Sequence, residues 1–68
     1  MASVAVLPRL DEFALVRLVH DVVRPDGVLP AGSEGAIVFR HGDGEAYEVE
    51  FAAPFRDVVT LTAADLQA

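Results

Sequence analysis

The chain has 68 residues, of which 53% are hydrophobic, and it contains no cysteine. A chain of this size forms one small domain, with neither a disulfide nor a thiolate metal site to stabilise it. Eleven acidic against five basic residues give a net charge of -6, which disfavours binding to nucleic-acid phosphates or to an anionic membrane surface. The high apolar fraction predicts exposed apolar surface, and therefore a protein partner or a homo-oligomer.

Residues 1–9 are predicted to form a loosely ordered arm, and residues 10–68 a single folded domain. The opening segment up to Pro8 lacks the basic start and the apolar stretch of a signal peptide. No run approaches the roughly 20 apolar residues that span a bilayer. We therefore expect a cytoplasmic protein.

The segment Phe13–Val23 fits two kinds of secondary structure. Its apolar residues match a helical stripe and a strand face equally well, so periodicity alone leaves both open. Valine is its most frequent residue, and valine packs well on a pleated sheet but loses rotamer freedom in a helix. We predict a strand over Phe13–Val19.

A long, turn-rich loop is predicted over His20–Glu34. Arg24-Pro25-Asp26-Gly27 forms one turn, and Pro30-Ala31-Gly32-Ser33 forms a second with Gly32 at a position of positive φ. Loops of this length in small domains are often functional.

Three further strands are predicted over Gly35–Arg40, Tyr47–Phe51 and Val58–Leu61, with a tight turn at His41–Gly44 between the first two. The middle strand has the clearest pattern, because its apolar residues alternate with glutamates that face water. The Tyr47 ring is expected to point inward with its hydroxyl at the rim of the core.

A short helical turn is predicted over Thr62–Leu66. Thr62 caps it, Asp65 reaches back as in a capping box, and Leu66 closes one end of the core. The order of elements predicts an all-β fold in a small closed barrel, which removes exposed sheet edges. A helical Phe13–Val23 would give an open meander covered by one helix instead.

Three segments, Leu29–Val38, Ala46–Phe51 and Val59–Leu61, resemble a family of short bacterial proteins of unknown function. Members carry a leucine-proline-x-glycine-x-x-glycine-x-valine stretch and a tyrosine-glutamate-valine-glutamate-phenylalanine strand. The resemblance covers Leu10–Leu66, but Ala36 replaces the usual threonine and the connection before the last strand is shorter. It implies a five-stranded SH3-like barrel with a short C-terminal helical turn. It also implies that the protein is encoded beside a toxin-like or nuclease-like partner. It implies no catalytic residues.

No recognisable catalytic motif is present, so we expect no enzyme and no cofactor. A barrel this small is filled by its own side chains and leaves little room for a pocket. The candidate nucleophiles lie in no known motif; they are Ser3, Ser33, Thr60 and Thr62.

No metal site is expected either. His20 and His41 have Asp21 and Asp43 nearby in the sequence, but the spacing of these residues does not match the four-ligand patterns of structural zinc sites.

The candidate partner-binding residues come from the long loop, the hairpin tip and the outward-facing glutamates. In SH3-like barrels the first loop and the neighbouring hairpin tip commonly frame a binding face. A stripe of glutamates, which Glu45 extends, would steer a basic partner by charge complementarity. The set is Asp21, Arg24, Asp26, Arg40, Asp43, Glu48 and Glu50.

The predicted function is that of a small acidic protein-binding module, an antitoxin or immunity-type inhibitor of a basic, nuclease-like or toxin-like partner. The alternative is a non-catalytic accessory subunit or a self-assembling structural barrel. Fold alone does not separate these two functions, because function belongs to the sites that a fold carries.

Overall fold

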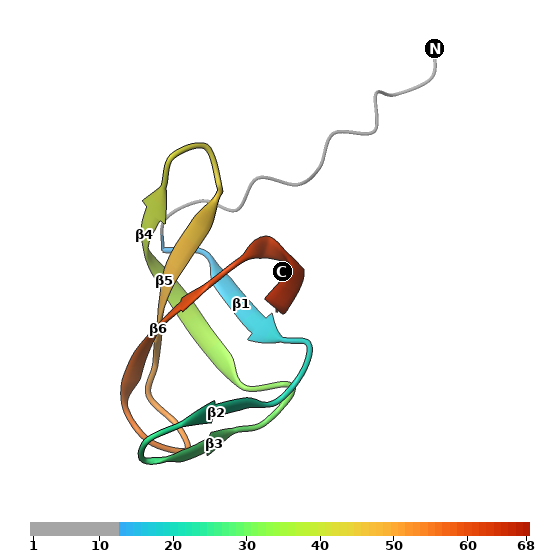
Figure 1. Cartoon of the computed structure of the whole chain (residues 1–68), viewed down its shortest axis with the longest axis vertical. Helices are drawn as coiled ribbons and strands as arrows, with labels where there is room; N and C mark the ends of the chain where they lie inside the picture. The colour runs from blue at the N-terminus through green and yellow to red at the C-terminus, as the bar shows by residue number, and fades with distance from the viewer. Residues whose placement is uncertain (1–12) are drawn as a thin grey trace.

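The computed structural model describes residues 13–68, and the predicted arm over residues 1–9 lies outside this range. Strands make up most of the described chain, and its helical structure is a single 3-10 turn (Figure 1). In order, the elements are β1 (Leu15–Leu18), β2 (Val22–Arg24), β3 (Gly27–Leu29), β4 (Glu34–His41), β5 (Ala46–Phe51), β6 (Asp57–Leu61), η1 (Ala63–Asp65) and β7 (Leu66–Gln67). The predicted all-β fold is confirmed.

Five of the strands form one antiparallel sheet in the order β6-β5-β4-β1-β7, and β2 and β3 form a separate hairpin. The sheet is strongly curled into a half-barrel (Figure 1). The expected closed barrel is corrected in one respect, because β6 and β7 are the two edges of the described sheet and do not pair with each other. Strand β7 has only two residues, and it pairs with β1. It is therefore too short to pair with β6 as well and close the barrel.

The core lies on the concave side of this sheet. In β5 the buried residues Tyr47, Val49 and Phe51 alternate with the half-buried Ala46, Glu48 and Glu50, as the sequence pattern predicted. The same alternation continues on the neighbouring strands, and the buried apolar residues form one cluster. Its members are Val16, Leu18, Leu29, Ile37, Tyr47, Val49, Phe51, Val59, Leu61 and Leu66.

The ambiguous segment Phe13–Val23 contains strands β1 and β2, so the helical alternative is wrong. In β1 the buried Val16 and Leu18 alternate with exposed neighbours, and β1 pairs with β4 along its length. The strand begins later than predicted because Phe13 has a φ of 66°, in the left-handed region where a strand cannot continue.

The expected long loop at His20–Glu34 is corrected by the hairpin of β2 and β3. The turn predicted at Arg24–Gly27 is confirmed as the turn of this hairpin. The hairpin is attached to the core by Leu29, which is fully buried, and by Val22, which packs against the core. The predicted second turn also forms: Ser33 N donates to the Pro30 carbonyl at 3.0 Å, and Gly32 has a φ of 89°.

At the C-terminal side, the predicted helical turn is the 3-10 turn η1. Asp65 Oδ2 accepts hydrogen bonds from the Thr62 backbone N–H at 2.8 Å and from the Thr62 hydroxyl at 3.1 Å, so Asp65 reaches back as expected. Leu66 is buried and closes the core, also as expected. The fifth strand, β7, was not predicted as a strand; it pairs with β1 through Leu66 and Gln67.

Candidate functional site

The convex side of the sheet carries exposed apolar side chains, and we call it the outer face. The strand registers place Val58, Glu50, Ala36 and Leu15 side by side in one row across β6, β5, β4 and β1. A second row contains Thr60, Glu48 and Phe39. The outer face therefore consists of Leu15, Ala36, Phe39, Glu48, Glu50, Val58 and Thr60.

Three large apolar side chains of the outer face remain open to solvent. Leu15 is 62% exposed, Phe39 50% and Val58 46%. Single exposed apolar residues are common on protein surfaces, but a group on one sheet face is typical of a contact surface.

A β-bulge brings Phe39 to this face. The β4–β5 register shifts between Ile37 and Phe39, so Phe39 lies opposite Glu48. Strict alternation would have pointed Phe39 into the core beside Ile37, because residues two apart share a face of a strand. The extra residue of a bulge re-aims the side chains that follow it. Nothing in the sequence marks this position, and Phe39 was therefore absent from the predicted site.

A shallow depression of about 300 Å³, largely open to solvent, adjoins Leu15, Ala36 and Glu50 of the outer face. Leu15, Ala36 and Ala52 supply its apolar surface, and Glu34, Glu50 and Arg56 supply its charges. Its volume is at the lower end of small-molecule sites, which bury most of their ligand. An open depression of this size suits one side chain of a protein partner better than an enclosed ligand.

The two glutamates predicted for the site both lie on the outer face, but their carboxylates differ. Glu48 is held by His41 Nε2 at 2.7 Å and by the Thr60 hydroxyl at 2.8 and 2.9 Å. These hydrogen bonds, the one from His41 first, lower the pKa of Glu48 below its ordinary 4.5. Glu50 has a looser contact, with Arg56 Nη1 at 3.5 Å. The Glu48 carboxylate is thus held in place by His41 and Thr60, whereas Glu50 has a long ion pair that a charged group of a partner could replace.

The other predicted residues fall into two groups at opposite ends of the sheet. Asp21, Arg24 and Asp26 belong to the β2–β3 hairpin and its base, whereas Arg40 lies near the end of β4 and Asp43 in the turn that follows. Figure 1 shows these two turns far apart, one at the bottom of the view and one at the top. The structure therefore does not bring the predicted set together into one site.

Arg24 has a structural contact that its place in a presumed loop did not suggest. Its Nε donates to Asp57 Oδ2 at 2.7 Å, and Nη2 lies 3.5 Å from Oδ1. The hydrogen bond from Arg24 lowers the pKa of Asp57 and raises that of Arg24. This pair fastens the hairpin to the start of β6.

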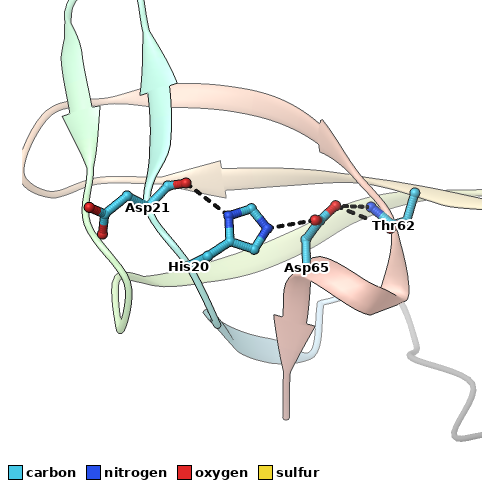
Figure 2. A network of polar contacts seen from close by, with 4 residues as sticks. All are labelled: His20, Asp21, Thr62 and Asp65. Atoms are coloured by element: carbon cyan, nitrogen blue, oxygen red, sulfur yellow. Dashed lines mark hydrogen bonds and ion pairs between the residues drawn. The ribbon is translucent and has the colours of Figure 1, made fainter.

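A second polar network surrounds His20, at the end of β1 (Figure 2). Its Nδ1 lies 2.8 Å from the carbonyl oxygen of Asp21, and its Nε2 lies 2.7 Å from Asp65 Oδ1. Asp21 in turn uses its carboxylate to accept the Ala31 N–H at 2.7 Å. His20 and Asp65 are 45 positions apart, so only the fold reveals the contact.

The two histidines belong to separate networks, His20 with Asp65 and His41 with Glu48. Within residues 13–68, no three or more histidine or acidic side chains gather as metal ligands would. The expectation of a protein without a metal site stays a prediction. Over the same range, no helix combines the length and apolar character that crossing a bilayer requires.

Comparison with known proteins identifies a family for this chain. No curated protein and no solved structure matches the chain. The model of the family described as Domain of unknown function (DUF4926) matches residues 12–68. Because this match takes in nearly the whole chain, the protein belongs to the DUF4926 family.

Proposed function

We propose that the protein is a protein-binding module that holds a basic partner against the outer face of its sheet. The observation that carries the proposal is the row of Leu15, Ala36, Glu50 and Val58, with Phe39 in the row beside it. This arrangement combines exposed apolar side chains with carboxylates, beside a shallow depression that Leu15, Ala36 and Glu50 help to line.

The apolar residues supply the main attraction. Burying a large apolar side chain contributes about 1.5–3 kcal/mol, and aromatic or aliphatic anchors at the centre of an interface commonly dominate its energy. Phe39 and Leu15 suit this role because each is a large exposed side chain on a paired strand, so no backbone has to become ordered on binding.

Two exposed ion pairs at or beside the outer face can accommodate a basic partner. Arg17 lies 3.9 Å from Glu34, and Arg56 lies 3.5 Å from Glu50, both on exposed side chains. Exposed ion pairs at such distances contribute little to stability. An arginine or lysine of the partner can therefore take the place of Arg17 or Arg56 beside the carboxylate. The net charge of -6 steers a basic protein toward this one.

The type of module we propose is an antitoxin or immunity-type inhibitor without catalysis of its own, acting in the cytoplasm. A nuclease attracts phosphate with a basic surface, and an acidic module that covers this surface blocks it. The curled sheet, the separate β2–β3 hairpin and the 3-10 turn near the C-terminus support the SH3-like barrel that the family resemblance implies.

The test begins with co-purification of the tagged full chain from its native host, followed by titration of the isolated partner against outer-face variants. Leu15→Gln and Phe39→Ser are expected to weaken binding by about tenfold or more each. The matched control is Val23→Gln, which removes an apolar side chain 79% exposed on the separate β2–β3 hairpin. Equal affinities for all three variants, or a partner without basic surface, would contradict the proposal.

A self-assembling subunit is the second candidate, favoured by the edge strand β6. Edge strands are normally protected by charges, proline or bulges, but β6 contains Val58, Val59, Thr60 and Leu61 after its single acid, Asp57. Light scattering across micromolar concentrations separates the two candidates. A dimeric mass that persists in Leu15→Gln and disappears when Thr60 is replaced by proline would favour assembly through β6.

A further inference from the structure

Three segments of the chain meet at His20. Figure 2 shows its ring between the backbone carbonyl of Asp21 and the carboxylate of Asp65, which also accepts two hydrogen bonds from Thr62. Beside the ring, the Val19 N–H donates to the Asp65 carbonyl at 3.0 Å. These contacts join the connection after β1 to the 3-10 turn that leads into β7. We call His20, Asp21, Thr62 and Asp65 the histidine clasp.

The geometry fixes the protonation state in which the histidine clasp is complete. A backbone carbonyl only accepts hydrogen bonds, and so does an ionised carboxylate. Both ring nitrogens of His20 face such acceptors, at 2.8 and 2.7 Å. Each nitrogen must therefore carry a proton, so the complete clasp contains the imidazolium cation.

The electrostatic surroundings agree with this assignment. The hydrogen bond to Asp65, and next the one to the Asp21 carbonyl, raise the pKa of His20 above its ordinary 6.5. The Thr62 backbone N–H, and next His20, lower the pKa of Asp65. Among the described residues, Asp21 and Asp65 are the charged groups that act on His20, and both are acidic. The ring is 52% exposed, so it exchanges protons directly with solvent.

We propose that the histidine clasp is a pH-sensitive device that holds the 3-10 turn η1 and strand β7 against β1 when His20 is protonated and loosens them when it is neutral. A neutral imidazole has a single N–H, so one of its two acceptors would face a lone pair instead of a donor. The ring then has to turn away from Asp21 or from Asp65. This proposal does not depend on the outer face or on any partner.

Strand β7 is the element that responds, because its pairing with β1 is short. It pairs with β1 through two residues, Leu66 opposite Leu18 and Gln67 opposite Arg17. Leu66 is buried and anchors the strand, whereas Gln67 is exposed. Opening β7 would leave the edge of β1 unpaired, and an unpaired edge can accept another strand.

The test is a proton titration of the full chain followed by NMR. The His20 ring is expected to titrate with a midpoint above 6.5, and the His20→Gln variant identifies its signal. Protection of the Val19 amide from exchange, corrected for the intrinsic pH dependence of exchange, is expected to fall by about two- to fivefold as the ring loses its proton, the range typical of exposed ion pairs. The Gln67 amide, on β7 itself, should lose protection over the same pH range, whereas the Leu66 N–H donates to the Ala63 carbonyl and reports on the turn η1.

The matched control is His41→Gln, which removes the other histidine and its bond to Glu48 but leaves the histidine clasp intact. This variant should retain the loss of protection at Val19, and His20→Gln should abolish it. A His20 midpoint at or below 6.5 would overturn the proposal, as would a pH-dependent loss that persists in His20→Gln. Where a variant fails to fold, the ring titration and the amide protection of the unaltered chain still test the proposal, because loss of protection must follow the His20 midpoint.

Discussion

Gly35 in β4 shows how closely the strands pack at one residue. It is buried, and a Cβ atom there would lie 2.7 Å from Val49 Cγ1 and 2.9 Å from both the Glu50 carbonyl oxygen and Phe51 Cε2. Two of these neighbours are core side chains and the third is backbone, so none can move away easily. Space, and not an unusual φ, requires glycine at this position.

Gly35→Ala is therefore expected to destabilise the protein by about 1–3 kcal/mol, the usual cost of overpacking a core. Urea denaturation at neutral pH measures the loss as a lower midpoint with an unchanged slope. For comparison, Gly32→Ala should lose stability through its positive φ alone, because no atom lies within 4 Å of the added Cβ. An unchanged midpoint for Gly35→Ala would mean that β4 and β5 separate without cost.

The sequence predicts side-chain orientation well wherever period two is unbroken. In β5 it correctly places Tyr47 in the core and Glu48 on the outer face. The prediction is wrong for Phe39, because the bulge after Ile37 reverses the alternation. No residue type in this part of the sequence indicates the bulge. The outer face was thus half predicted: its glutamates were found, and its main aromatic anchor was not.

The β2–β3 hairpin is held in place mainly by contacts with residues outside it. Each of its strands has three residues, too few for alternation to be visible, so the sequence revealed its turn but not its pairing. The ring of Phe55 lies against Gly27, and the Arg24–Asp57 pair joins β2 to β6 across 33 positions. Contacts of this separation follow from the fold, which no local pattern encodes.

Asp57→Asn is expected to destabilise the protein at neutral pH by weakening the bond from Arg24. In the folded protein the Val58 N–H donates to Asp57 Oδ1 at 2.9 Å, and asparagine retains an oxygen for this hydrogen bond. The loss of stability in Asp57→Asn therefore measures the effect of removing the negative charge. The pKa of Asp57 is lowered in the folded state, so its contribution is complete above the ordinary 3.8 and disappears as the pH falls through the folded value. Urea denaturation at pH 7 and pH 3 measures the difference.

The difference between the unaltered chain and Asp57→Asn should therefore shrink in acid. An equal difference at both pH values would assign it to packing. Arg24→Gln is the companion variant: if the two residues act as a pair, the double variant should lose less than the sum of the single losses.

At the scale of the whole molecule, the net charge predicted an acidic surface but not its distribution. Three of the arginines, Arg17, Arg24 and Arg56, pair with acids of the same chain. Among the described residues, these arginines are interleaved with acids on the sheet and the β2–β3 hairpin, so the net charge of -6 does not by itself locate an acidic surface. Composition gives the total charge, whereas only the strand registers show which charges neutralise each other.

The titrating groups together predict a stability maximum in mildly acidic solution. The raised pKa of His20 means that its contribution is complete below the ordinary 6.5 and is lost as the pH rises through the folded value. The lowered pKa values of Glu48, Asp57 and Asp65 mean that theirs are complete above 4.5 and are lost as the pH falls. Both sets of contributions are therefore complete between pH 4.5 and 6.5.

Thermal unfolding across pH 3 to 9 tests this prediction, and the two limbs of the profile have separate origins. His20→Gln should flatten the decline on the alkaline side. It should also reduce the acid-side loss slightly, because His20 is the second cause, after the Thr62 N–H, of the lowered pKa of Asp65. Asp57→Asn should reduce the loss of stability on the acid side and leave the alkaline side unchanged. The pI of about 4.5 calls for dilute samples near that pH, because a protein without net charge associates readily. A melting temperature that keeps rising to pH 8 would mean that the histidine clasp contributes nothing to the stability of the fold.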